Sequence, residues 1–262
     1  MCYNEPAMLL AINVGNTTAK LGLFAGERLL DTWRLATDVR RTSDEYGILL
    51  KGLLDRRFAE RELDGVVVGS VIPRLEPILA EMCERYLGQR PFFLEPGLDV
   101  GMPVLTDNPE QVGVDRLADA LAGLRLYGRP LVTIDLGTAT VLNAISAEGA
   151  FLGGAIAPGL ALTMDALVGG TAKLPPIALV APARAIGRNT SAAMQSGFFF
   201  GYVGMVDGLI ERIWGEMGRC RVVATGGHSE MIAAHTNKID IVDPDLTLHG
   251  LRLAHEIVGG RR

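Results

Sequence analysis

The sequence predicts an α/β protein built from two related domains, each with a mixed β-sheet flanked by helices. The first observation behind this prediction is an internal repeat: residues Leu9–Leu30 align without a gap on residues Leu131–Leu152, at a constant offset of 122 residues. The second is that strand-like runs alternate with amphipathic helical runs along the rest of the chain. The third is that each half opens with strands in succession, which favours mixed sheets over purely parallel ones.

The internal repeat indicates a duplicated domain rather than a chance similarity between two hairpins. Glycine and threonine recur at the turn of each hairpin, where they have a chemical reason to recur. The period is far longer than the repeat of a solenoid, so it predicts two homologous domains. We place them at residues 8–127 and 128–262, with the boundary near Tyr127–Pro130. The identical pairs are Leu9/Leu131, Ile12/Ile134, Gly15/Gly137, Thr18/Thr140, Ala25/Ala147 and Leu30/Leu152.

The remainder of the first half is expected to form a strand, a helix, a short strand and a second helix. The segments are Glu62–Pro73 as a buried strand, Pro73–Gly88 as a helix that ends at its glycine, and Pro91–Pro96 as a short strand. Residues 107–128 are expected to form one continuous helix. Asn108 is a good N-cap, Pro109 suits the first helical position, and Gln111 completes a capping-box pattern.

The second half continues with helices around one further strand. Residues 190–217 predict a long helix with Thr190 or Ser191 as its cap. Residues 221–235 predict a strand, a glycine turn and a helix, and residues 246–258 predict a closing helix.

Composition excludes several classes of function. The 262 residues carry a net charge of −5 and no Lys/Arg cluster, which argues against a nucleic-acid partner. No apolar run reaches transmembrane length, so no membrane partner is expected. The three cysteines are scattered without a CxxC pair, which fits a reducing cytoplasm and offers no metal site. The polar residues 1–7 are not a signal peptide and are expected to be either a disordered tail or an artefact of the assigned start site.

The stretch TIDLGTAT, residues 133–140, has the chemistry of a phosphate cradle. Asp135 ends a buried strand, and Gly137 lets the backbone approach a ligand closely. Thr138 and Thr140 supply hydroxyls beside backbone N–H groups. Since a carboxylate repels phosphate, Asp135 predicts a bound cation between the two. The alternative is an ordinary hairpin with threonine-rich edges and a surface aspartate.

Three turns of this kind occur in the chain. NVGNTTAK, DLGTAT and ATGGHSE each place a Gly/Thr/Asn turn directly after a strand. Together they could enclose a nucleotide between the two domains, where ligands are often bound. Neither a G-x-x-x-x-G-K-[ST] P-loop nor a G-x-G-x-x-G motif is present, so neither the P-loop nor the Rossmann mode of binding applies.

The stretch GVDR, residues 113–116, suggests a site for an acidic substrate. Asp115 is expected two turns into the helix of residues 107–128, with Asp119 one turn further on the same face, so a solvated face is one interpretation. Against it, Gly113 would stand in mid-helix at a cost of about 1 kcal/mol relative to Ala, which suggests close approach of a ligand or another chain. A carboxylate beside Arg116 suits a kinase, because one group accepts a hydroxyl proton and the other binds an acidic substrate.

Ten stretches, in order along almost the whole chain from Met8, together carry a resemblance to type III pantothenate kinases. They are NVGNTTAKLGLF, GSVIP, DNPEQVGVDR, TIDLGTATVLNAIS, LGGAIAPGL, TAKLPPI, IGRNTSAAMQSG, GYVGMVDGLIERI, ATGG and DPDLTLHGLRL. The resemblance implies two duplicated ribonuclease-H-like domains, the actin-like ATPase fold that acetate and sugar kinases share with heat-shock chaperones and actin. It implies ATP-dependent phosphorylation of pantothenate to 4'-phosphopantothenate, the first step of coenzyme A biosynthesis. It also implies a homodimer, Mg²⁺ with the ATP, and a monovalent cation, K⁺ or NH₄⁺.

The resemblance also implies roles for individual residues. Asp115 would be the catalytic base, Asp135 the ligand of the monovalent cation, and Thr190 a substrate contact. The pantothenate contacts would be Gly113, Val114, Asp115 and Arg116. The nucleotide contacts would be Asn13, Val14, Gly15, Asn16, Thr17, Thr18, Ala19 and Lys20 in the first turn, Thr138 in the second, and Gly226 and Gly227 against the adenosine.

Four positions depart from the pattern of the family. Asn13 stands where the family usually has Asp, Thr106 where it has Tyr, Asn143 where it often has Asp, and Val114 where it has Ala. Asn13 matters most, because a hydrogen bond to a charged group contributes about 1.5–3 kcal/mol. Two alternatives to an active pantothenate kinase therefore stay open. One is a degenerate kinase fold that binds pantothenate or nucleotide as a regulatory protein, and the other is a kinase for another small hydroxyl compound.

Overall fold

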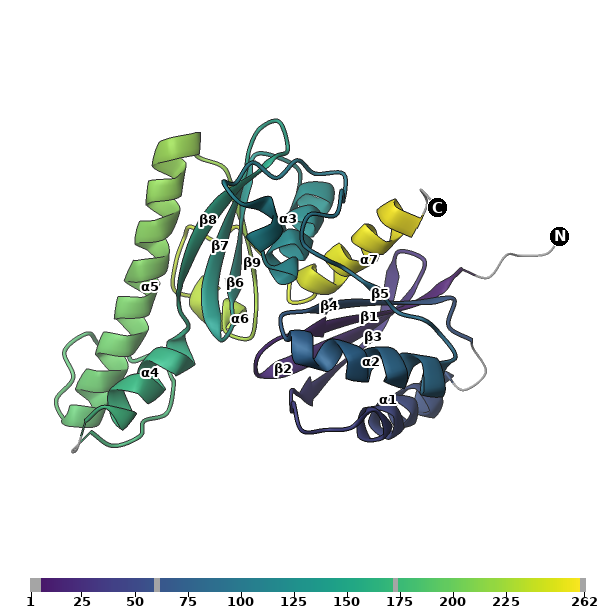
Figure 1. Ribbon diagram of the computed structural model, residues 1–262. Helices are drawn as coiled ribbons and strands as arrows, with labels where there is room; N and C mark the ends of the chain where they lie inside the picture. Colours follow the sequence, from purple (N-terminus) through teal and green to yellow (C-terminus); the bar gives the residue numbers. More distant parts are fainter. Residues whose placement is uncertain (1–5, 59–61, 172–173, 260–262) are drawn as a thin grey trace. The chain divides into compact units, whose positions relative to one another are not determined.

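The computed structural model describes residues 6–58, 62–171 and 174–259 (Figure 1). The chain divides into two units. Unit 1 contains the described residues within 1–101, 108–121 and 247–262, and unit 2 contains those within 102–107 and 122–246. The domain limits predicted above, 8–127 and 128–262, follow the order of the chain and stay a prediction. Of the expected N-terminal tail, residues 1–5 lie outside the described residues.

Unit 1 contains a five-stranded mixed sheet in the order β3-β2-β1-β4-β5. Its first three strands are antiparallel neighbours, whereas β4 is parallel to β1 and β5 is parallel to β4. The strands are β1 (Met8–Val14), β2 (Thr18–Ala25), β3 (Arg28–Ala36), β4 (Gly65–Ser70) and β5 (Phe92–Phe93). The helices are α1 (Ser43–Phe58), η1 (Pro73–Leu75), α2 (Glu76–Met82), η2 (Cys83–Leu87), η3 (Pro109–Gln111), the first part of α3 (Val114–Tyr127), and α7 (Leu246–Gly259) from its second residue.

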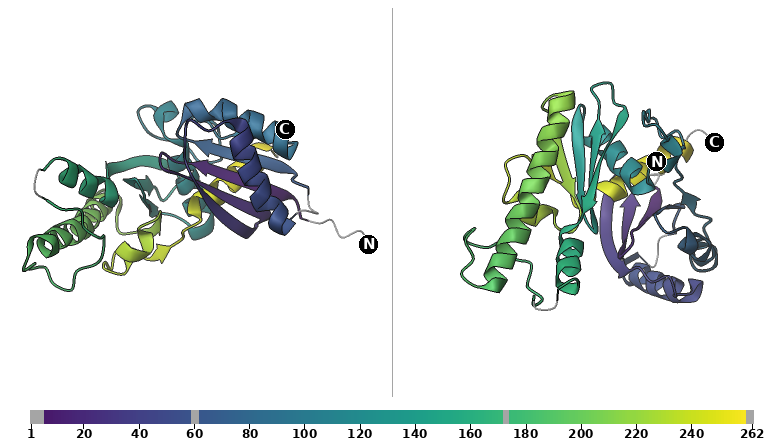
Figure 2. Two further views of the ribbon diagram at one scale, coloured as in Figure 1. Left: turned by 90° about the horizontal axis from the view of Figure 1, so that it is seen from below. Right: turned by 60° about the vertical axis from the view of Figure 1, so that its left-hand side comes forward.

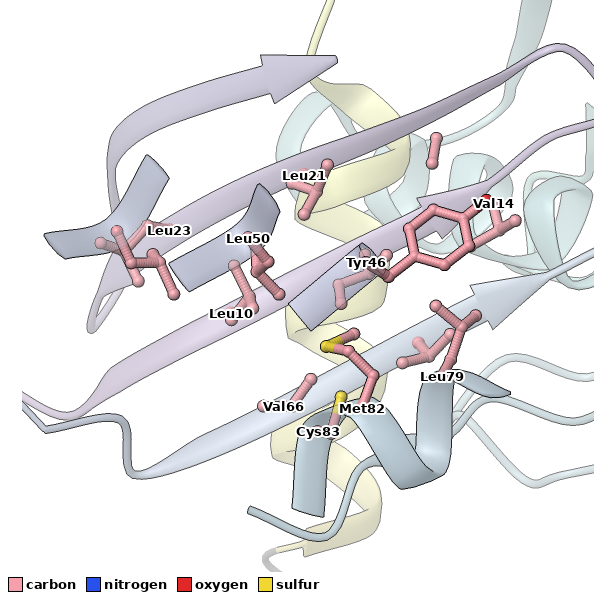
Figure 3. Close-up of a cluster of buried hydrophobic side chains, with 14 of the residues drawn as sticks. Leu10, Val14, Leu21, Leu23, Tyr46, Leu50, Val66, Leu79, Met82 and Cys83 are labelled. Atoms are coloured by element: carbon pink, nitrogen blue, oxygen red, sulfur yellow. The ribbon is translucent and has the colours of Figure 1, made fainter. Parts of the chain in front are cut away.

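One face of this sheet is covered by α1 and α2, as the close-up of the buried cluster shows (Figure 3). The helices contribute Tyr46, Leu50, Leu79 and Met82, and the strands contribute Leu10, Val14, Leu21, Leu23 and Val66. Because successive residues of a strand point to opposite faces, Asn13 lies on the other face of β1.

That other face is covered by α7, which lies across the sheet from α1 and α2 (Figure 1). A Cβ on Gly69 would lie 2.7 Å from the Leu251 side chain, so the helix sits directly on the strands. The helix α7 also packs on α3, since a Cβ on Gly250 would lie 2.0 Å from the carbonyl oxygen of Ala118. Glycine at position 250 therefore lets the two helix backbones touch.

Unit 2 repeats this architecture with a sheet in the order β10-β9-β6-β7-β8. Figure 2 shows α5 lying along one face of this sheet, where it buries a row of aromatic and aliphatic side chains. The strands are β6 (Leu131–Leu136), β7 (Ala139–Ile145), β8 (Phe151–Pro158), β9 (Arg221–Thr225) and β10 (Ile241–Val242). The helices are the rest of α3, α4 (Leu160–Gly169), α5 (Thr190–Met217) and α6 (Ser229–Ala233).

The two sheets share one topology, which confirms the predicted duplication. In each, the neighbours are the third, second, first, fourth and fifth strands, in that order. Each sheet also has an irregularity at the same point of its second hairpin, between Leu23 and Phe24 in unit 1 and between Ala144 and Ile145 in unit 2. A bulge displaces a single residue of a ladder, so a bulge at the same position in both sheets is a specific similarity between the two units.

The gap-free alignment is nevertheless wrong by one residue on the second strand. Val14 pairs with Ala19, whereas Leu136 pairs with Thr140, so the second turn is one residue shorter. Thr140 is therefore the counterpart of Ala19 rather than of Thr18, and it is fully buried. The hairpin between β7 and β8 is one residue longer than its counterpart, which restores the offset of 122 on the third strand.

Two helix starts differ from their predicted positions. The helix expected from residue 107 begins at Val114, because Pro109–Gln111 form a separate 3-10 turn and the Asn108 side chain makes no capping hydrogen bond. The long helix α5 is capped by Asn189 rather than by Thr190 or Ser191. The Asn189 side chain accepts a hydrogen bond of 2.8 Å from the backbone N–H of Ala192.

Within the described ranges, no helix combines the length and the apolar character needed to cross a membrane.

The contact between α7 and α3 yields a stability prediction. We expect Gly250→Ala to lower the free energy of unfolding by about 1–3 kcal/mol, because the new methyl group overlaps the Ala118 backbone. The control is Gly52→Ala in α1, where the added Cβ meets nothing within 4 Å. This substitution should stabilise the helix by up to about 1 kcal/mol, because alanine has the higher helix propensity. Denaturant unfolding of both variants measures the difference. Equal stability of the two variants would contradict the packing described here.

Candidate active site

The first turn follows β1 in unit 1 and offers exposed polar residues. Asn13 is the penultimate residue of β1 and lies in register with Lys20 and with Gly69. The turn is closed by a hydrogen bond from the N–H of Gly15 to the carbonyl of Thr18 (3.1 Å). Between them, residues 16–18 are exposed. Val14 and Ala19 are buried on either side, so they can offer a ligand only their backbone.

The second turn follows β6 in unit 2 and has the same closing bond, from the N–H of Gly137 to the carbonyl of Ala139 (3.0 Å). Asp135 is its penultimate strand residue, as Asn13 is in the first turn. Thr138 is exposed at the tip, and its role as a ligand contact stays a prediction. The prediction that Thr140 offers its hydroxyl to a ligand is wrong, because that hydroxyl is buried and lies 2.6 Å from the Tyr202 hydroxyl.

The third turn, Gly226–Gly227, packs directly on the second turn. Gly226 has a φ of +92°, and a Cβ there would lie 2.3 Å from Oδ1 of Asp135. The N–H of His228 donates to the carbonyl of Leu136 (3.1 Å), which ties the two turns together. A Cβ on Gly227, by contrast, would meet nothing within 4 Å, so that residue stands beside open space. Two of the three predicted turns therefore form one surface with the Asp135 carboxylate in it.

Asp115 lies in the first turn of α3, in unit 1, rather than two turns into a helix. Its Oδ1 accepts a hydrogen bond from the N–H of Arg116 (2.8 Å). A Cβ on Gly113 would lie 2.6 Å from the same Oδ1. Gly113 thus precedes the helix, which corrects its expected mid-helix position, and its missing side chain leaves room for the carboxylate of Asp115. The approach of a ligand to Gly113 stays a prediction. A carboxylate at this helix end also interacts favourably with the helix dipole.

The groups around Asp115 differ from a solvated helix face. Burial lowers the pKa of the Arg116 guanidinium from its usual value, while the charge of Asp115 opposes that shift. Asp119, one turn further, is buried and accepts a hydrogen bond of 2.6 Å from the hydroxyl of Thr247 in α7. The solvated-face interpretation is therefore wrong for Asp119, and Asp115 is half-buried.

The predicted site residues are divided between the two units. The first turn and residues 113–116 belong to unit 1, whereas Asp135, Thr138, the glycine pair and Thr190 belong to unit 2. Thr190 is exposed at the first position of α5. Among the described residues, no group of three or more His, Cys, Asp or Glu side chains could hold a metal ion.

The family model described as type III pantothenate kinase matches residues 9–212. The chain belongs to the type III pantothenate kinase family. It is 48% identical over 251 residues to the type III pantothenate kinase of Moorella thermoacetica, covering 95% of this chain and 99% of that protein. It is 47% identical over 250 residues to the Myxococcus xanthus protein of the same name, with 95% and 98% covered.

A solved structure supports the same fold. The inorganic polyphosphate/ATP-glucomannokinase from Arthrobacter sp. strain KM superposes with a TM-score of 0.52 at 16% identity, covering 97% of this chain and 99% of that one. This similarity and the two mixed sheets confirm the expected actin-like ATPase fold. The chain is therefore a kinase of the type III pantothenate kinase family, and both ATP and a divalent metal follow from that membership.

Two residues that sequence reasoning missed lie directly behind the turns. Thr37 follows β3 and donates from its N–H to the carbonyl of Thr17 (3.0 Å), and Gly159 follows β8 and donates to the carbonyl of Thr138 (3.1 Å). Only their positions in the sequence could have identified them, since they are again 122 residues apart. They differ in residue type, so a search for identical residues does not find them.

The packing of the third turn on Asp135 predicts a selective effect. We expect Gly226→Ala to lower kinase activity about 10²-fold, because the new Cβ and the positive φ displace the Asp135 carboxylate. The control is Gly52→Ala in α1, away from the three turns, where a Cβ would also meet nothing within 4 Å and ADP formation should stay close to that of the unchanged enzyme. A coupled assay of ADP release compares the two variants. If both lose activity alike, the contact with Asp135 is not the reason.

Proposed function

We propose that this chain transfers the γ-phosphoryl group of ATP to the primary hydroxyl of pantothenate and forms 4'-phosphopantothenate, the first step of coenzyme A biosynthesis. The observation that carries the proposal is the Asp115–Arg116 pair at the start of α3 in a chain of this family. A half-buried carboxylate that accepts a backbone N–H is held in one orientation, as a general base must be. We further propose that the enzyme works in the cytoplasm.

Asp115 orients the substrate hydroxyl and takes its proton late in the transfer, because the transition state of phosphoryl transfer is loose. The neighbouring Arg116 binds the carboxylate of pantothenate. A guanidinium presents two parallel N–H donors to a carboxylate, which fixes orientation as well as charge. Its partial burial strengthens that attraction, since a low local dielectric screens it less. Gly113 and Val114 provide backbone beside the substrate, and Thr190 is a further substrate contact.

The nucleotide is bound by the three turns. Residues 13–20 and Thr138 approach the phosphates, and the glycine pair 226–227 lies against the adenosine. The open space beside Gly227 and the exposure of residues 16–18 support these roles. Mg²⁺ bound with the ATP at these turns would supply positive charge that neutralises the phosphates during phosphoryl transfer.

Asp135 binds the monovalent cation, K⁺ or NH₄⁺. Its carboxylate lies against the Gly226 turn and close to Gly137, where a Cβ would be 3.1 Å from Oδ1. A carboxylate in a phosphate-binding turn needs a cation between itself and the phosphates. A site with a single carboxylate and nearby backbone carbonyls suits a weakly hydrated monovalent ion. A site with several acidic residues would suit such an ion less well.

The active form is a homodimer in which unit 2 supplies the contact surface. The strand β8 is an edge strand that exposes Leu152 (41%) and Ile156 (65%). The helix α5 exposes Phe200, and its residues Gly197 and Gly201 have no neighbour within 4 Å of a Cβ position. Each such glycine costs about 1 kcal/mol of helix stability relative to alanine. Close packing of a second copy of the chain on the helix would explain why glycine occurs at these two positions.

The central test is substitution of the proposed base. We expect Asp115→Asn to lower kcat about 10²–10⁴-fold with pantothenate as substrate, because the amide orients the hydroxyl but accepts no proton. The affinity for Mg·ATP, measured by calorimetry, should stay close to that of the unchanged enzyme. Equal loss of ATP binding would identify Asp115 as a structural or metal-binding residue instead. Turnover only with another alcohol would indicate a different substrate.

The amide at position 13 leads to a second test. A carboxylate there would help to hold hydrated Mg²⁺, so Asn13→Asp should lower the Mg²⁺ concentration for half-maximal rate and raise turnover by up to about 150-fold. Asp135→Asn should instead remove the dependence on K⁺ together with most activity. Initial rates over a Mg²⁺ and a K⁺ series measure both effects. An inactive wild type that Asn13→Asp revives would favour the regulatory-protein alternative.

A further inference from the structure

The same two hydrogen bonds hold the phosphate turns of both units. In unit 1, the N–H of Gly15 donates to Thr18 and the N–H of Thr37 donates to Thr17. In unit 2, Gly137 donates to Ala139 and Gly159 donates to Thr138. The strand registers place these residues at equivalent positions in the two sheets. Because the same two hydrogen bonds recur at equivalent positions, they are a regular feature of this turn rather than a result of the packing in one unit.

The direction of these bonds matters for binding an anion. A carbonyl oxygen carries partial negative charge and repels a phosphate, whereas an N–H group attracts it. The residue after the third strand engages the carbonyl at the tip of each turn and fixes its peptide plane. Donors that are already oriented before the ligand arrives need no reorganisation on binding.

Thr37 adds a side-chain hydrogen bond that its counterpart, Gly159, cannot make. Its hydroxyl donates to the carbonyl of Gly15 (2.8 Å), so one residue engages two carbonyl groups of the first turn. In unit 2, a Cβ on Gly159 would lie 2.4 Å from the carbonyl oxygen of Gly137 and 2.3 Å from that of Thr138. The second turn is therefore held by close backbone approach, and the first by a side-chain hydroxyl.

We infer that Thr37 is a positioning residue for nucleotide binding: its hydroxyl fixes the Gly15 carbonyl and thereby orients the first phosphate turn. The inference rests on the proposed function, since it assigns the first turn to the nucleotide. Thr37 acts through the turn, so its loss should weaken ATP binding and leave pantothenate binding unchanged.

The loop after Thr37 keeps its place without the hydroxyl. The Tyr46 hydroxyl of α1 accepts from the N–H of Asp38 (3.1 Å) and donates to its carbonyl (3.0 Å). The carboxylate of Asp38 in turn binds Arg40. Replacing Thr37 by valine, which has the same shape, thus removes one hydrogen bond and leaves the rest of the loop anchored.

The experiment compares Thr37→Val with Thr37→Ser. We expect Thr37→Val to raise the Kd for Mg·ATP and KM for ATP about 2- to 12-fold, the range that one neutral hydrogen bond corresponds to. Thr37→Ser keeps the hydroxyl and should restore both values, and KM for pantothenate should be unchanged in both variants. The control is Thr236→Val, which removes a threonine hydroxyl bond to Asp207 elsewhere in the chain.

The outcomes separate this inference from the proposed function. If wild type binds and turns over ATP but Thr37→Val has the same ATP constants, the inference is wrong and the proposed function stands. If Thr37→Val lowers the melting temperature and alters both KM values equally, the residue is merely structural. If wild type neither binds ATP nor transfers phosphate to pantothenate, the proposed function fails first.

Discussion

The parallel pairing of the first and fourth strands is the constraint on which the second unit's site depends. In the ladder between β6 and β9, Asp135 lies opposite Thr225, so the residue after Thr225 must lie against the end of β6. That residue is Gly226, and no side chain fits between it and the Asp135 carboxylate. Because the carboxyl ends of parallel strands share one edge of a sheet, two turns distant in sequence become one surface. The hydrogen bond from His228 to Leu136 then fixes that surface.

Much of this architecture could be predicted from the sequence because it depends on local patterns of apolar and turn-forming residues. Strand length and order in each hairpin follow from apolar runs interrupted by Gly, Asn and Thr, and the repeat at an offset of 122 gives the duplication. The offset was nevertheless wrong on the second strand. The turns differ by one residue, and the later hairpin compensates, so the alignment is correct on both sides of the error. Two compensating one-residue shifts of this kind cannot be recognised from the identical residues alone.

The wrong sequence-based expectations near the site have two physical causes, which are a local break in the backbone and a tertiary contact. Capping signals at residues 108–111 predicted an early helix start, but they support only a 3-10 turn, because the backbone is extended at Val112 (ψ 120°) and α3 begins at Val114. A helical wheel placed Asp119 on a solvated face, yet α7 covers it and Thr247 provides its hydrogen bond. The partner of Asp119 is not visible from local sequence, since Thr247 lies far along the chain. The supports of the turns were missed for the same reason.

The two copies of the turn differ in charge and agree in backbone. Both keep the glycine, the closing hydrogen bond and the donor behind the turn, which are the features that the hairpin needs. At the penultimate strand residue, one copy has Asn13 and the other Asp135, and both are half-buried on the same relative face of their sheets. An amide and a carboxylate of equal size fit one backbone, so this difference changes electrostatics without changing the fold. In the proposed function, Asp135 binds a monovalent cation, whereas Asn13 leaves Mg²⁺ to the phosphates and water. The strands that carry the two turns do not depend on this charge, so a duplicated turn can change its electrostatics and keep its backbone.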